Sequence, residues 1–112
     1  MLNRKTAINT VQAFIEACNK SNITFNKVIL FGSYAYGQPG AHSDVDLLVV
    51  KDLAESVLRD KVQIRRAWWK MPRREPLLPF DLILVSPERH QERLENAGGF
   101  YDEIVHKGLK LV

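Results

Sequence analysis

The segment Val45-Asp46-Leu47-Leu48-Val49-Val50 constrains the fold more than any other part of this sequence. Apart from Asp46 it shows no alternation of apolar and polar residues, so both faces of the strand that it predicts must be covered. Strands of this kind lie inside a sheet that has helices packed against it. We therefore place residues 45–50 centrally in a helix-covered sheet.

The rest of the sequence predicts helices and further strands around this one. Ile8, Val11, Ile15 and Cys18 recur at spacings of three and four, which predicts one apolar helix face and a packing role for Cys18. Clusters of Gly and Pro mark loops over residues 37–40 and 71–79. The expected helices span 3–19, 52–69, 87–96 and 100–107, and the other expected strands span 25–31, 80–85 and 109–112.

Two helix starts carry local signals. Asp52 followed by Glu55 resembles a capping box, so we expect the second helix to begin there, with Leu58, Val62 and Trp69 on one face. Ser86-Pro87 is typical of an N-cap followed by a first helical residue. These elements together predict an α+β (α/β-like) fold, with a mixed central sheet flanked by helices.

Composition limits what this fold can do. A chain of 112 residues with 46% hydrophobic and 26% charged residues predicts one globular domain over 1–112, with no repeat or linker. The single cysteine excludes an internal disulfide, and the N-terminus has no signal-peptide pattern, so we expect a cytoplasmic protein. No apolar stretch approaches the roughly 20 residues that a membrane span needs.

One set of residues indicates a catalytic or ligand-binding site. Gly32-Ser33 follows an expected strand, ten residues intervene, and Asp44-Val45-Asp46 follows. Two carboxylates one residue apart on a strand point the same way, and a Gly-Ser turn can present backbone N–H groups to a phosphate. Asp81 is a third carboxylate inside an apolar run, where it is costly unless paired or metal-bound. The pattern predicts a site for a metal ion and a triphosphate.

Such a site suits nucleotidyl transfer. Two divalent ions can neutralise a triphosphate, activate a hydroxyl and stabilise the leaving pyrophosphate. Magnesium is held by few carboxylates plus phosphate oxygens and water, so Asp44, Asp46 and Asp81 can anchor two Mg²⁺ ions if one carboxylate bridges them.

These residues resemble a known family. The runs Phe31-Gly32-Ser33-Tyr34-Ala35-Tyr36-Gly37 and Ser43-Asp44-Val45-Asp46-Leu47-Leu48-Val49-Val50, with Asp81 later, are similar to the nucleotidyltransferase superfamily of the DNA polymerase beta type, in its minimal nucleotidyltransferase (MNT) branch. The resemblance covers nearly the whole chain. It implies that Gly32 and Ser33 contact the triphosphate, that Asp44 and Asp46 ligate magnesium, and that Asp81 completes the site or serves as base.

The resemblance also implies a partner. Several members of this size are antitoxins of toxin–antitoxin pairs, encoded beside a HEPN ribonuclease toxin, and transfer AMP from ATP to a tyrosine of that toxin. The alternative is a catalytically weak domain that neutralises the partner by binding alone. Tyr36 favours that alternative, because many members have an arginine immediately before the glycine that is Gly37 here, and tyrosine offers phosphate no charged fork.

Residues outside the motif have blander interpretations. The stretch Arg65–Arg74 interleaves basic residues with Trp68 and Trp69. We favour a solvated face with both tryptophans in the core, ahead of a partner interface and then of single-stranded nucleic acid. We expect His42, His90 and His106 to be solvated or surface residues, and Tyr34 and Tyr36 to pack around the turn.

Overall fold

The structure, a computed structural model, describes residues 3–39, 44–71, 80–96 and 99–112. The expected helices and strands are all present, with one short helix added after Gly32. In chain order they are α1 (Arg4–Lys20), β1 (Lys27–Phe31), α2 (Ser33–Tyr36), β2 (Val45–Val50), α3 (Val57–Lys70), β3 (Phe80–Val85), α4 (Pro87–Glu95), α5 (Gly99–Lys107) and β4 (Leu109–Lys110). The predicted loop over 71–79 lies outside the described residues, except for Met71.

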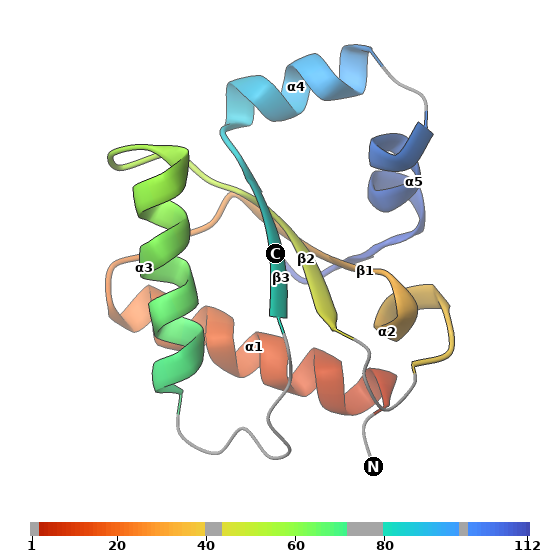
Figure 1. Cartoon of the computed structure of the whole chain (residues 1–112), viewed down its shortest axis with the longest axis horizontal. Coiled ribbons are helices and arrows are strands. Elements are labelled where there is room, and N and C mark those ends of the chain that lie inside the picture. The colour runs from red at the N-terminus through yellow and green to blue at the C-terminus, as the bar shows by residue number, and fades with distance from the viewer. Residues whose placement is uncertain (1–2, 40–43, 72–79, 97–98) are drawn as a thin grey trace.

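The four strands form one mixed sheet, as the sequence predicted. Their order is β3-β2-β1-β4, so β2 lies inside the sheet. β2 pairs in parallel with β3 and antiparallel with β1, and β1 pairs antiparallel with β4. The apolar character of β2 on both faces is explained by this position, because helices cover the sheet on two sides (Figure 1).

Alternate residues of β2 enter two separate parts of the core. Val45, Leu47 and Val49 pack with residues of α1, α2 and α3, whereas Leu48 and Val50 pack with Ile104 of α5. Side chains alternate between the two faces of a strand, so Asp46 faces the same side as Leu48 and Val50. Its carboxylate therefore lies on the α5 side of the sheet. Cys18 is fully buried in the first cluster, which confirms its packing role.

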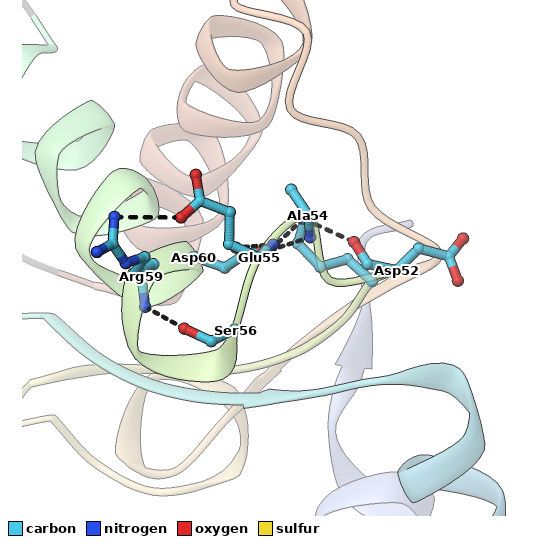
Figure 2. Close-up of polar contacts among 7 residues, drawn as sticks. Asp52, Ala54, Glu55, Ser56, Arg59 and Asp60 are labelled. Carbon is cyan, nitrogen blue, oxygen red and sulfur yellow. Dashed lines mark hydrogen bonds and ion pairs between the residues drawn. The ribbon is translucent and has the colours of Figure 1, made fainter.

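The start of α3 differs from the prediction. The helix begins at Val57, and its N-cap is Ser56, whose hydroxyl accepts a hydrogen bond from the Arg59 N–H at 3.1 Å (Figure 2). The capping box at Asp52 and Glu55 was therefore wrong. The backbone N–H of Glu55 instead donates to the buried carboxylate of Asp60, which holds this segment outside the helix.

α3 buries one of its two tryptophans, whereas the sequence predicted both in the core. Leu58, Val62 and Trp69 are 74%, 45% and 50% exposed, whereas Ile64 and Trp68 are buried. Trp68 stacks on Phe80 of β3, with ring centroids 4.4 Å apart. Only one of the two tryptophans thus lies in the core, and α3 presents a second apolar face to solvent. No described helix is both long and apolar enough to cross a bilayer.

Candidate active site

Three segments bring the predicted site residues to one edge of the sheet. β1 ends at Phe31 and turns at Gly32, whereas β2 and β3 begin at Val45 and Phe80. Because β1 runs antiparallel to β2 and β3 runs parallel to it, these three positions meet at the same edge. Asp44, which precedes β2 directly, is exposed there.

Asp46 and Asp81 face each other across the β2–β3 ladder. They are direct partners in the parallel register, and neighbouring strands lie about 4.8 Å apart, so their side chains leave the same face of the sheet side by side. Asp46 is half-buried, whereas the side chain of Asp81 is 62% exposed. The sequence placed Asp46 and Asp81 on two expected strands, and the structure shows that these strands are neighbours with the two residues in register.

The turn at Gly32 lies directly against Asp46. Phe31, the residue before it, is the antiparallel partner of Asp46. Gly32 has φ +77°, and a Cβ at this position would overlap the Asp46 Oδ2 atom. Glycine is therefore required here both for its backbone conformation and for the close approach of the carboxylate. Ser33 begins α2, in which the N–H groups of Ala35 and Tyr36 donate to the Gly32 carbonyl oxygen, so that Ser33 and Tyr34 carry the N–H groups that precede the first helical bonds.

Burial and crowding disfavour the charged form of Asp46. Burial is the larger cause, followed by the negative charges of Asp81 and Asp44, and together they raise the pKa of Asp46 to about 6. Carboxylates that repel each other in this way are stabilised by a shared cation. Asp44 and Asp81 thus both act electrostatically on the same central side chain.

Tyr34 of α2 lies close enough to the site for the charge of Asp44 to act on it. Its side chain is buried, as the sequence predicted, and its hydroxyl has no hydrogen-bond partner among the described residues. Burial raises the pKa of Tyr34, and the charge of Asp44 raises it further, so the phenol stays protonated beside the site. Tyr36 is 42% exposed on the same short helix.

The sequence interpretation missed Arg65 as a residue of the site. Arg65 reaches from α3 to the β3 edge of the sheet, where its Nη1 donates to the carbonyl oxygen of Phe80 at 3.3 Å and its Nη2 lies 3.8 Å from Asp81 Oδ1. In the sequence Arg65 was only one of several basic residues, and no local signal separated it from Arg66.

Comparison with known proteins shows which family this chain belongs to. The family model described as polymerase beta, nucleotidyltransferase matches residues 12–108. The chain belongs to this nucleotidyltransferase family. A crystal structure of a candidate nucleotidyltransferase from Sulfolobus solfataricus matches with a TM-score of 0.60 and 17% sequence identity, over 96% of this chain and 80% of that one. At this identity the likeness shows a shared fold. No curated protein matches the chain.

The donor set of this nucleotidyltransferase fits a divalent cation. Magnesium prefers carboxylate oxygens, and Asp46 and Asp81 supply two from adjacent strand positions whose mutual repulsion a cation would relieve. Within the described ranges, no three His, Cys, Asp or Glu side chains are grouped closely enough to hold an ion by themselves. Since magnesium usually keeps water and phosphate ligands, the assignment of Asp44, Asp46 and Asp81 as its ligands stays a prediction.

The histidines of the chain lie elsewhere. His90 on α4 is buried, not at the surface as predicted, because its Nδ1 hydrogen-bonds the Tyr101 hydroxyl of α5. Burial, and then the charge of Lys27, lower the pKa of His90. His106 is 71% exposed and pairs with Asp102 at 3.1 Å, which confirms it as a surface residue. His42 lies outside the described residues.

Proposed function

We propose that this chain is an antitoxin-type nucleotidyltransferase that transfers AMP from ATP to a hydroxyl, a tyrosine hydroxyl, of a partner HEPN ribonuclease toxin. One observation carries the proposal: Asp46 and Asp81 are paired side by side at the sheet edge where the Gly32 turn packs against Asp46. Membership in the nucleotidyltransferase family supports the reaction type.

Each group at this edge has a distinct task in that reaction. Gly32 allows the backbone to approach the carboxylate, and the N–H groups at the start of α2 are directed to the triphosphate. Asp44, Asp46 and Asp81 would hold two Mg²⁺ ions, which supply charge neutralisation and activation of the acceptor. The acceptor oxygen forms a bond to the α-phosphorus, the bond from that phosphorus to the β-phosphate oxygen breaks, pyrophosphate leaves, and Asp81 takes the hydroxyl proton.

Labelled ATP tests this proposal. The protein, the product of the neighbouring gene and Mg²⁺ are incubated with ATP labelled on the α-phosphate, and label is measured on that product. The double variant Asp44→Asn/Asp46→Asn should lose at least about a hundredfold in transfer rate, since even outer partners of metal ligands contribute 10–100-fold. Its fold should persist, because amides relieve the repulsion around Asp46.

Asp52→Asn is the matched control, since Asp52 is exposed and lies beyond the other end of β2. It should transfer AMP as the unchanged protein does. Transfer at an unchanged rate by the Asp44→Asn/Asp46→Asn variant would refute the enzymatic proposal.

A second candidate function is neutralisation of the partner by binding alone. The observation that favours it is the exposed apolar face formed by Leu58, Val62 and Trp69 on α3. A hollow of about 380 Å³ adjoins this face, and Leu58, Val62 and Arg66 contribute to its lining. Apolar, aromatic and arginine side chains gathered on one surface are typical of protein interfaces.

Binding measurements separate the two functions. If binding alone is sufficient, a stable complex forms without transfer of label, and Leu58→Ser/Val62→Ser weakens the complex while Val112→Ser, an exposed apolar position elsewhere, does not. Adding single-stranded RNA to the same experiment tests whether this face binds nucleic acid instead. A complex that survives Leu58→Ser/Val62→Ser unchanged would rule out this face as the binding surface.

A further inference from the structure

The guanidinium of Arg65 is held in place by β3 and by the core beneath it. Its Nη1 donates to the Phe80 carbonyl oxygen at 3.3 Å, and its Cζ lies 5.6 Å from the centroid of the Phe80 ring. That ring is itself fixed, because it stacks on buried Trp68 and meets Phe14 edge-on at 5.7 Å. Arg65 is thus better ordered than an ordinary surface arginine, although its side chain is 39% exposed.

This anchoring brings a positive charge to one particular oxygen of Asp81. Arg65 Nη2 lies 3.8 Å from Asp81 Oδ1, the same oxygen that accepts the Leu82 N–H at 3.0 Å. Oδ2 of Asp81 has no hydrogen-bond or ion-pair partner among the described residues. One oxygen of the carboxylate is therefore occupied by the protein, and the other is left to a ligand.

Without a cation, the paired aspartates need a counter-charge. Asp46 lies opposite Asp81 in the register, and the charges of Asp81 and Asp44 act on it unfavourably. Arg65 is the cationic side chain that pairs with one of these three aspartates within the described residues. A divalent cation at Asp46 and Asp81 would meet this positive charge at close range.

We propose that Arg65 is a positioning residue that acts as the counter-ion of Asp81 while no metal ion is bound. Its positive charge opposes the binding of a divalent cation to Asp46 and Asp81. The proposal rests on the proposed function, because it presumes that the aspartates receive a cation. The guanidinium restrains the carboxylate through Oδ1 and lowers the charge repulsion at the sheet edge.

Binding of Mn²⁺ alone tests this role without any reaction. Free Mn²⁺ is followed by electron paramagnetic resonance during titration of the protein, its Arg65→Gln variant and the matched control Arg66→Gln. Arg66 is exposed one residue further along α3, so the control removes the same charge without touching Asp81. Arg65→Gln should tighten Mn²⁺ binding roughly two- to fivefold more than Arg66→Gln does. This is the ratio of dissociation constants that corresponds to the free energy of a partly exposed ion pair.

Two further variants distinguish a charge effect from a folding defect. Arg65→Lys keeps the charge and should bind Mn²⁺ closer to the unchanged protein than Arg65→Gln does. In an Asp81→Asn background, Arg65→Gln should no longer differ from Arg66→Gln. Thermal unfolding without metal verifies that each variant is folded.

The outcomes separate this inference from the proposed function. If the unchanged protein binds Mn²⁺ but Arg65→Gln binds no more tightly than Arg66→Gln, the counter-ion role is wrong and the metal site stands. If Arg65→Gln still tightens binding when Asp81 is Asn, the counter-ion role is also wrong. If the unchanged protein binds no Mn²⁺, the metal site of the proposed function fails and this inference fails with it.

Discussion

Two aspartates, Asp60 and Asp46, show what this protein does with a carboxylate removed from water. Asp60 is 5% exposed, and its charge is compensated by Lys51, with which it pairs at 2.9 Å. It also accepts hydrogen bonds from the N–H groups of Ala54 and Glu55 at 2.7 and 3.1 Å (Figure 2). Asp46 is half-buried, and the charges around it are two further carboxylates. The surroundings of Asp60 neutralise its charge, whereas those of Asp46 add negative charge that a cation would neutralise.

The pKa values follow from this difference. Burial alone would raise the pKa of Asp60, but hydrogen bonds from Lys51, Ala54 and Glu55 and the charge of Lys51 lower it below its usual value. For Asp46, burial and both neighbouring charges act in the same direction, and its pKa rises to about 6. We conclude that Asp60 has a structural role and fixes the segment before α3. The charged form of Asp46 is disfavoured by its surroundings, which suits a residue that binds a ligand.

The largest expected effect distinguishes the two residues by stability. Asp60→Asn should lower the free energy of unfolding by about 3–5 kcal/mol, because it leaves the buried charge of Lys51 without a partner. Asp46→Asn should leave it unchanged within about 1 kcal/mol or raise it, because it removes a repelled charge. Urea denaturation measures both.

Lys51→Met/Asp60→Leu is the control for the Asp60 result. It should recover only part of the loss, because removing both charges still leaves the Ala54 and Glu55 N–H groups without an acceptor. Equal losses for Asp60→Asn and Asp46→Asn would contradict the comparison.

A smaller effect concerns the close approach of Gly32 to Asp46. Gly32→Ala should destabilise the protein by at least about 2 kcal/mol, since it combines a positive φ with overlap of the Asp46 carboxylate. Gly99 is the matched control: its φ is +73°, but no atom of the described residues outside its own helix lies within 4 Å of its Cβ position, so Gly99→Ala should cost about 1 kcal/mol.

The difference between these two glycine variants measures the overlap itself. It should shrink when Asp46 is also replaced by Ala. If Gly32→Ala costs no more than Gly99→Ala, the turn does not lie as close to Asp46 as the structure places it.

The smallest effect is a pH dependence of opposite sign at the two aspartates. The folded-state pKa of Asp46 is raised to about 6 from 3.8, so the folded state binds more protons, and the stability of the protein relative to Asp46→Asn rises as pH falls from above 6 towards 3.8. The pKa of Asp60 is lowered, so stability relative to Asp60→Asn is lost as pH falls below 3.8.

Denaturation of the three proteins between pH 3 and pH 7 measures these slopes. Titration of His90, whose pKa is lowered, is common to all three and cancels in the differences. Slopes of the same sign would show that the two environments are not opposed.

The elements that depend on local pattern were predicted closely. The limits of β3 were right, and Ser86 caps α4 through the Arg89 N–H as expected. The start of α3 was wrong because Asp52 and Glu55 matched the capping-box pattern, whereas the structure uses Ser56, which lacks that pattern but is itself a favoured N-cap residue. Asp60 decided between the two caps, because its buried carboxylate accepts hydrogen bonds from the N–H groups of Ala54 and Glu55 and so keeps these residues outside the helix.

The sequence could not choose which apolar face of α3 is buried. Leu58, Val62 and Trp69 share one face, and Ile64 and Trp68 lie on another. Both faces have helical spacing, so periodicity alone does not rank them. Phe80 decided between them, because its ring stacks on Trp68 from a strand that is distant in the chain.

By itself, the sequence determined the strand that must lie inside the sheet and the motif Gly32-Ser33, Asp44, Asp46 and Asp81, because strand periodicity and turn chemistry are local properties. The tertiary structure alone decided that Asp46 and Asp81 are register partners, that Arg65 pairs with Asp81, and that Lys51 and Asp60 form a buried ion pair. These contacts depend on which strands pair and which helix face is covered, and those choices minimise the free energy of the whole chain rather than of any one segment.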